Sequence, residues 1–179
     1  MTHRFNGFTL VEMLVVVMVM AIALGIAAPS FAALAERNRA LAVFHQLTAT
    51  LAGARLAAVQ LGRPVTICPT RDGRQCRQDL VWDEGWMSYI DVRRADQPAN
   101  VGTVIRHVEL SGRGIAVRSS VGRHRIRFQP SGWASGANIS LRLCSQRAQR
   151  LLGAVIVNNA GRPRSERQDA AEGSCPYVP

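Results

Sequence analysis

The chain opens with a long apolar segment that has the length of a membrane-spanning helix. The nineteen residues from Leu10 to Ala28 carry a single charge, that of Glu12. A helix rises about 1.5 Å per residue, so about 20 such residues cross the hydrocarbon layer of a bilayer, which is about 30 Å thick. The sequence therefore predicts a transmembrane helix over residues 8–29, preceded by a short segment, residues 1–7.

A cleaved secretory signal peptide is the alternative for this segment, because Ala27-Ala28-Pro29-Ser30 can imitate a small-residue cleavage site. Two features argue against it. A carboxylate in an apolar run is costly unless it finds a partner, and Glu12 lies within this run. The helical pattern also continues beyond Pro29.

Residues 30–61 continue as an amphipathic helix. Their apolar positions recur at spacings of three, four and seven, which is the pattern of one helical face: Leu34, Leu41, Phe44, Leu47, Leu51, Ala54 and Ala58. Gly62 and Pro64 then stop the helix. The apolar stripe needs a partner, and a sheet built from the residues that follow is the expected one.

From residue 62 to residue 179 the pattern changes to short β-rich runs separated by Gly, Pro and Asp. The expected strands are Val65–Cys68, Gly85–Val92, Val101–Leu110, Gly114–Val117, His124–Phe128, Ile139–Cys144 and Gly153–Val157, with a polar loop at Thr70–Gln78. Because no helical pattern separates these strands, we expect an antiparallel sheet and an α+β fold class. The tail from Asn158 to Pro179 has little strand signal and is expected to be irregular.

The charge balance favours an anionic partner. The net charge is +10 and all 22 basic residues are arginine, which points to nucleic acid or a membrane surface. Codon bias can account for part of the arginine count in a chain without lysine.

No nucleophile motif or phosphate-binding glycine loop is present, so we expect neither an enzyme nor a cofactor. Trp82, Trp86 and Trp133 are expected to pack in the core or in loops.

The residues Gly7-Phe8-Thr9-Leu10-Val11-Glu12 resemble the processing site of type IV pilins and type II secretion pseudopilins. The resemblance implies that residues 1–7 are a leader, that a prepilin peptidase cleaves between Gly7 and Phe8, and that Phe8 is then methylated. It also implies that Glu12 pairs with the N-terminal amine of a neighbouring subunit, which would give a carboxylate in an apolar layer its opposite charge. Pro29 matches the usual kink position of the family.

The same resemblance sets the expected location. Arg4 precedes the apolar segment, and positive charge near a span favours the cytoplasmic side. We therefore expect a single-pass protein of the inner membrane whose globular region faces the periplasm. After assembly it would lie in a pilus at the cell surface.

Later residues resemble the H-type pseudopilin branch, which includes the FimT and FimU minor pilins. The stretch after the helix carries Thr66-Ile67-Cys68, Asp72-Gly73, Cys76, Trp82 and Gly85-Trp86, and the later strands carry Phe128, Gly132, Leu143-Cys144 and Gly161-Arg162-Pro163-Arg164. The resemblance implies a pilin-like fold, in which a long N-terminal helix packs on an antiparallel sheet, and other pilin subunits as partners.

The four cysteines are expected to form two disulfides, because the domain faces an oxidising compartment. Three pairings are possible. Cys68–Cys76 closes a nine-residue loop around the turn signal Asp72-Gly73 and leaves Cys144 for Cys175. These bridges are worth about 2.5 and about 3.5 kcal/mol in the chain-entropy model. Another pairing, free thiols or a metal site are the alternatives, although the spacing does not suit zinc.

Gly161-Arg162-Pro163-Arg164 resembles the C-terminal G-R-x-R motif through which FimT-type minor pilins bind DNA during natural transformation. Two guanidinium groups about 6–7 Å apart on an extended chain can each bind a separate phosphate. Gly161 would let the backbone approach DNA closely, and Arg167 would extend the row. Nothing in the motif recognises base edges, so we expect binding that is independent of sequence and steeply dependent on salt.

The motif occurs twice, since Gly122-Arg123-His124-Arg125 also matches, whereas about 0.2 chance matches are expected. We assign the function to residues 161–164 because they follow the last expected strand. Arg123, Arg125 and Arg127 form a candidate second basic stripe on one strand face, and a solvated sheet face is the alternative.

The expected function is therefore that of a minor type IV pilin that binds extracellular DNA for uptake. Two other functions stay open. A minor pilin can have a purely structural role in pilus assembly, and a type II secretion pseudopilin would contact exported proteins instead of DNA. Binding of DNA at near-physiological salt separates the first function from the other two.

Overall fold

The computed structural model describes residues 9–110, 114–134, 136, 138–147, 149–167 and 175. The chain divides into two compact units, one up to Asn38 and the other from Arg39 onward. One helix, α1, runs from Leu10 to Leu61 and contributes residues to both units. The expected leader and cleavage site, including Gly7 and Phe8, lie outside the described residues.

Thr9 caps the first turn of α1. Its Oγ1 accepts a hydrogen bond from the N–H of Glu12 at 3.3 Å, and its carbonyl oxygen accepts one from the N–H of Met13 at 3.2 Å. A hydroxyl at this position satisfies one of the N–H groups that a helix start leaves unpaired. The carboxylate of Glu12 lies in the first turn, where the positive end of the helix dipole favours it.

The first unit consists of helix with an apolar surface. Between Leu10 and Asn38 no residue is buried. A window of 18 residues has a mean hydropathy of 2.7, so this part of α1 is long and apolar enough to cross a membrane. Pro29 lies inside the helix, where it cannot donate a hydrogen bond to the carbonyl of Gly25.

α1 ends where the sequence predicts. Gly62 has a φ of +60°, a left-handed conformation that glycine reaches at little cost after the last helical residue. The first strand, β1, begins directly afterwards and spans Val65–Pro69.

The strands form two antiparallel sheets of four strands each, and the first of these, sheet A, has the order β3-β2-β1-β5. Its other members are β2 (Gly85–Ile90), β3 (Val104–Glu109) and β5 (Ile126–Phe128). The expected strand at Val101–Leu110 begins instead with a 3-10 turn at Val101–Thr103.

Sheet B has the order β4-β6-β7-β8. It contains β4 (Ile115–Ser119), β6 (Ile139–Ser145), β7 (Arg150–Val157) and β8 (Pro163–Arg167). β8 corrects the expectation of an irregular tail, because residues 163–167 pair in register with residues 153–157 of β7. The unpaired edge of an apolar strand supplies the hydrogen bonds that the composition of β8 does not favour by itself.

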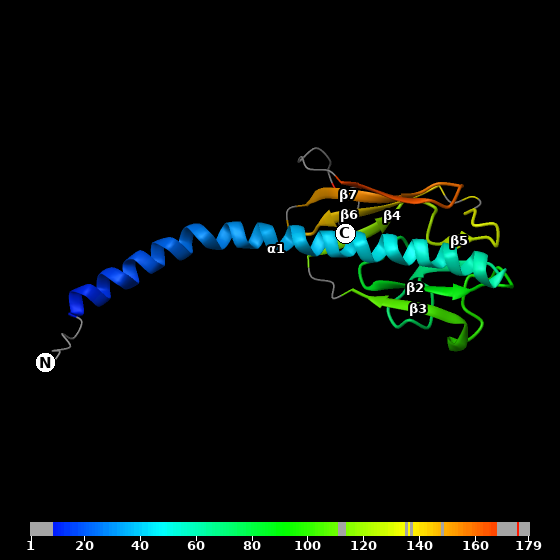
Figure 1. Ribbon diagram of the computed structural model, residues 1–179, viewed down its shortest axis with the longest axis horizontal. Helices are drawn as coiled ribbons and strands as arrows, with labels where there is room; N and C mark the ends of the chain where they lie inside the picture. Colours follow the sequence, from blue (N-terminus) through cyan, green and yellow to red (C-terminus); the bar gives the residue numbers. More distant parts are fainter. Residues whose placement is uncertain are drawn as a thin grey trace, which may run out of the picture. The chain divides into compact units, whose positions relative to one another are not determined.

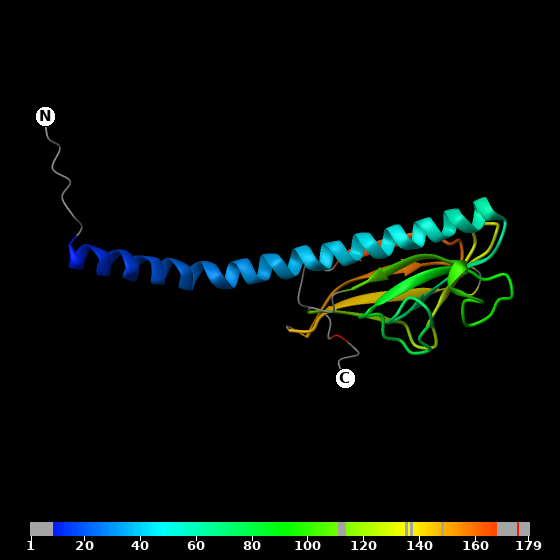
Figure 2. The ribbon, with the colours of Figure 1, turned by 90° about the horizontal axis from the view of Figure 1, so that it is seen from below.

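The C-terminal half of α1 lies over both sheets, as Figures 1 and 2 show from two directions. Its buried face carries Ala40, Val43, Phe44, Leu47, Leu51, Ala54 and Ala58, which belong to one hydrophobic cluster with residues of both sheets. Leu47 and Leu51 are fully buried, and burying a leucine side chain contributes about 1.5–3 kcal/mol. The expected pilin-like arrangement of a long N-terminal helix on antiparallel β-structure is therefore confirmed, with two sheets in place of one.

Candidate nucleic-acid interface

A tight turn over residues 158–161 presents the G-R-x-R motif. The N–H of Gly161 donates to the carbonyl of Asn158 at 2.9 Å, and Gly161 is buried with a φ of +72°. A methyl group at this position would overlap the carbonyl oxygen of Gly132. The glycine is thus required by packing within the chain, a reason that the sequence does not reveal, and its close approach to DNA stays a prediction.

The turn is attached to α1 through the loop that contains Gly132. Arg55, on α1, donates from Nε to the carbonyl oxygen of Gly132 at 2.9 Å. The N–H of Ala134 donates to the carbonyl of Asn159 at 3.0 Å. Hydrogen bonds therefore connect α1 to the loop at Gly132, and that loop to the turn that precedes Arg162. No sequence pattern indicates Arg55, because it lies 77 residues from its acceptor.

The arginines of the motif are exposed. Arg162 precedes β8, and its N–H donates to Oδ1 of Asn158 at 3.4 Å. Arg164 lies within β8, and its guanidinium is 3.2 Å from the carboxylate of Glu166. Both side chains of that pair are well exposed, at 69% and 57%, so the pair contributes at most about 1 kcal/mol and leaves Arg164 accessible.

Arg167 does not extend this row. It pairs with Gly153 of β7, whereas Arg164 pairs with Ile156. Residues three apart on a strand point to opposite faces, so Arg164 and Arg167 lie on different faces of sheet B. The register instead adds Arg142 of β6, which pairs with Ala154.

Arg142 shares a face with Arg164 because cross-strand partners lie on the same face. Ala154 pairs with Arg142 on one side and with Glu166 on the other, and Glu166 lies two residues from Arg164. The face of sheet B that carries the motif therefore holds a third arginine, which is half-buried. The sequence places Arg142 in an alternating strand, but it does not indicate which strands pair with that strand.

The candidate second stripe, Arg123, Arg125 and Arg127, is largely engaged within the chain. Arg125 forms an ion pair with Asp96. Arg127 pairs with Asp91, with its terminal nitrogen 2.7 Å from the carboxylate. Only Arg123 of the three has an exposed side chain. Acidic partners from residues 91–96 thus bind two members of the stripe, and a role of the stripe in binding DNA stays a prediction.

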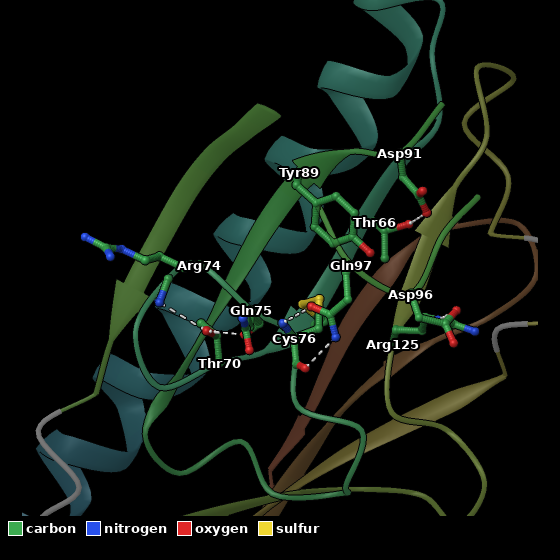
Figure 3. Close-up of a disulfide and its surroundings, with 12 residues drawn as sticks. Thr66, Thr70, Arg74, Gln75, Cys76, Tyr89, Asp91, Asp96, Gln97 and Arg125 are labelled. Atoms are coloured by element: carbon green, nitrogen blue, oxygen red, sulfur yellow. Dashed lines mark hydrogen bonds and ion pairs between the residues drawn. A yellow bond between two sulfur atoms is a disulfide. The ribbon is translucent and has the colours of Figure 1, made fainter. Parts of the chain in front are cut away.

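Asp91 is the centre of this network, whose surroundings Figure 3 shows. One carboxylate oxygen accepts from the hydroxyl of Thr66 at 2.6 Å and from Nε of Arg127 at 2.8 Å, and the other accepts from the N–H of Ala95 at 2.8 Å. The hydroxyl of Tyr89 donates to the carbonyl of Ala95 at 3.2 Å. Burial raises the pKa of Tyr89 to about 12, and the charge of Asp91 adds to the rise.

The structure pairs Cys68 with Cys76 and Cys144 with Cys175, with Cα–Cα distances of 5.5 and 5.9 Å. In the loop closed by the first bridge, the N–H groups of Arg74 and Gln75 donate to the carboxylate of Asp72 and lower its pKa. The side-chain amide of Gln97 holds both backbone groups of Cys76, at 2.7 and 2.9 Å (Figure 3). Cys175 is joined to β6, so the bridge closes a covalent loop around β7 and β8.

The three tryptophans differ in exposure. Trp82 and Trp86 are fully buried, as expected, but 56% of Trp133 is exposed. Trp133 lies in the loop between β5 and β6 and is only partly covered there. Among the described residues, no group of His, Cys, Asp and Glu could hold a metal ion.

Two families match the chain. Residues 44–161 match the family described as Type II transport protein GspH, and residues 2–28 match the prokaryotic N-terminal methylation motif. None of the curated proteins matches it. The first match ends at Gly161, so Arg162, Arg164 and Arg167 lie beyond it.

Crystal structures of the type IV minor pilin FimU from Pseudomonas aeruginosa (strain PAO1) are similar in fold. In one crystal form the TM-score is 0.60 at 19% identity, over 78% of this chain and 97% of FimU. In another it is 0.58 at 18% identity, over 75% of this chain and 98% of FimU. The similarity extends to nearly all of the FimU chain in both crystal forms.

Proposed function

We propose that this chain, which belongs to the family of Type II transport protein GspH, is a minor pilin that binds DNA through Arg162 and Arg164. The family and the methylation motif make it a pilin-like subunit, a minor pilin or pseudopilin, that is anchored in the inner membrane by its apolar helix and later incorporated into a filament. Processing between Gly7 and Phe8, and pairing of Glu12 with a neighbouring N-terminal amine, belong to the same proposal.

One observation carries the DNA-binding part of the proposal. Arg162 and Arg164 are exposed at the start of an edge strand, on a turn that is hydrogen-bonded to the loop held by Arg55. A guanidinium group binds phosphate through two parallel hydrogen bonds. Arg142 adds positive charge on the same sheet face, and the net charge of +10 favours encounter with a polyanion.

Contacts of this kind bind the phosphate backbone and not the bases. The affinity is therefore independent of sequence and falls steeply with salt, because each phosphate contact releases a counterion. A single subunit with two or three such contacts binds weakly. Copies repeated along a filament would raise the overall avidity without any new contact.

The test is a salt titration of duplex binding by the fragment that begins at Ser30. This fragment retains every residue of the main hydrophobic cluster, which begins at Ala40. The double variant Arg162→Gln/Arg164→Gln should reduce the slope of log K against log salt by about 2, since each lost phosphate contact removes about 0.9. Its matched control is Arg93→Gln/Arg106→Gln, which removes the same charge from exposed positions elsewhere.

The proposal predicts that the control retains most of the slope. Equal losses in the two double variants would show that only net charge matters and would contradict the assigned site. Glu166→Gln gives an independent arm, because it frees Arg164 from its carboxylate partner and should strengthen binding. If the unaltered fragment binds no DNA even at low salt, the chain is a filament subunit without this function.

A further inference from the structure

Trp133 is a largely exposed aromatic residue outside the hydrophobic core. The other two tryptophans are fully buried, whereas 56% of Trp133 is accessible to solvent. An exposed indole offers a large flat π surface, and such residues are concentrated where proteins bind partners. Trp133 is therefore a candidate contact residue for a partner.

Trp133 lies beside the turn that carries the arginine motif. The residue before it, Gly132, is in van der Waals range of Gly161 through its carbonyl oxygen. The residue after it, Ala134, donates its N–H to the carbonyl of Asn159 at 3.0 Å. Because both neighbours of Trp133 contact the turn, the backbone of Trp133 lies beside the segment that leads into Arg162, and its indole is largely exposed.

The backbone around Trp133 is well fixed. The carbonyl of Trp133 accepts from the N–H of Gln129 at 2.7 Å, and the N–H of Gly132 donates to the carbonyl of Gln129 at 2.8 Å. Arg55 holds Gly132 from α1. A rigid platform loses little conformational entropy on binding, which favours its use in recognition.

We propose that Trp133 stacks on an unpaired base of a DNA strand whose phosphates contact Arg162 and Arg164. This inference rests on the proposed DNA binding and names the class of DNA that the site prefers. Proteins that bind single strands without sequence preference combine a positively charged backbone track with aromatic side chains on which bases stack. Here the two parts belong to two segments, the loop at 132–134 and the turn at 158–161, whose backbones are in contact.

The preference for an unpaired base follows from the geometry of duplex DNA. In a duplex each base already stacks on its neighbours, so an indole at the phosphate backbone gains nothing by stacking except at an end. In a single strand the base rotates outward at little cost, and every base has a face that can stack. Single strands and overhangs therefore bind more tightly than closed duplex with the same number of phosphates.

The test uses the full chain in detergent micelles and measures affinity by fluorescence anisotropy of dye-labelled probes, a signal that survives substitution of Trp133. Quenching of tryptophan fluorescence in the unaltered chain is a second readout. The probes are a thymidine oligomer of about 12 nucleotides, within the site sizes known for single-strand binding, an abasic oligomer with the same number of phosphates, and a duplex closed at both ends. Because Trp82 and Trp86 are buried, quenching by the thymidine oligomer reports on Trp133.

Trp133→Ala should lower the affinity for the thymidine oligomer by about 5- to 150-fold, the range measured for the loss of one stacked base. It should leave the affinities for the abasic oligomer and the closed duplex unchanged. Trp133→Phe, which keeps a stacking face, should restore most of the affinity. The matched control is Val121→Ala, which removes an apolar side chain that is 72% exposed, and it should change none of the three affinities.

Several results would overturn the stacking role. If Arg162→Gln/Arg164→Gln abolishes binding and Trp133→Ala changes nothing, the proposed DNA site stands and the stacking role is wrong. The same conclusion follows if Trp133→Ala weakens all three probes equally. If it leaves DNA binding intact but reduces incorporation into filaments, a neighbouring subunit covers the indole instead. If the unaltered chain binds none of the probes, both proposals fail.

Discussion

Replacing Gly161 with alanine tests whether the arginine motif depends on the packing of its glycine. The residue has a φ of +72°, a left-handed conformation that costs an alanine about 1–2 kcal/mol. Its new methyl group would also overlap the carbonyl oxygen of Gly132, which is part of the backbone and is held by Arg55. Overpacking of this kind costs a further 1–3 kcal/mol, as a rough range.

Gly122 is the matched control, because it occupies the same place in the second copy of the motif. Its φ is +73°, and nothing lies within 4 Å of the position that a methyl group would take. Gly122→Ala therefore carries only the cost of placing an alanine in a left-handed conformation. We expect it to lower the free energy of unfolding by about 1–2 kcal/mol and Gly161→Ala to lower it by about 2–5 kcal/mol.

The assay is urea unfolding of the fragment from Ser30, followed by circular dichroism. With a slope of about 2 kcal/mol per molar urea, a difference of about 1–3 kcal/mol separates the two midpoints by about 0.5–1.5 M. Equal midpoints for the two variants would refute the reasoning, because they would show that the turn at Gly161 moves away from Gly132 at no cost.

Two further predictions concern the network around Asp91. Asp91→Asn should lower the free energy of unfolding by about 1–3 kcal/mol, because an amide NH2 would face one of the donors that the buried carboxylate now accepts from. Asp96→Asn, which removes the exposed partner of Arg125, should cost less than about 1 kcal/mol. Urea midpoints that shift equally would contradict this account. The pKa of Tyr89 is about 12 in the folded chain and about 10 in the unfolded chain. The contribution of this shift to the free energy of unfolding is therefore fully present below pH ~10. It should fall by about 2–3 kcal/mol as the pH rises toward 12. Urea midpoints at pH ~9 and ~11.5 measure this loss, and a midpoint that does not move would show that Tyr89 is not shielded from water.

The parts of the fold that depend on local pattern could be predicted from the sequence. Gly62 and Pro64 mark the end of α1, and the face from Phe44 to Ala58 is buried as its spacing predicts. The strands from β1 to β7 lie at or near their expected positions. These features are encoded by residues close together in the chain.

β8 could not be predicted in this way. Its residues Pro163-Arg164-Ser165-Glu166-Arg167 include no β-branched or aromatic side chain, and such sequences have a low tendency to form strands. The strand exists because the apolar strand β7 presents a free edge to it. The division into two sheets likewise depends on which strands pair, and alternation within a strand does not determine that.

The candidate site was predicted only in part. The motif at 161–164 and its exposed arginines follow from the sequence, but the reason for Gly161 lies in a contact with Gly132, about 30 positions away along the chain. The engagement of Arg127 also depends on a distant residue, Asp91, 36 positions earlier. Long-range partners of this kind leave no periodic signal in a single sequence.

The bridge between Cys144 and Cys175 has a mechanical consequence for a filament that is pulled. β8 is an edge strand, and tension applied to its arginines by a long tethered molecule would peel it from β7 one hydrogen bond at a time. Because Cys175 is covalently joined to β6, a β8 strand pulled off the edge remains attached to sheet B at both ends, through the turn to β7 and through the disulfide. The strand that meets the outside can thus carry force that its own hydrogen bonds would not withstand.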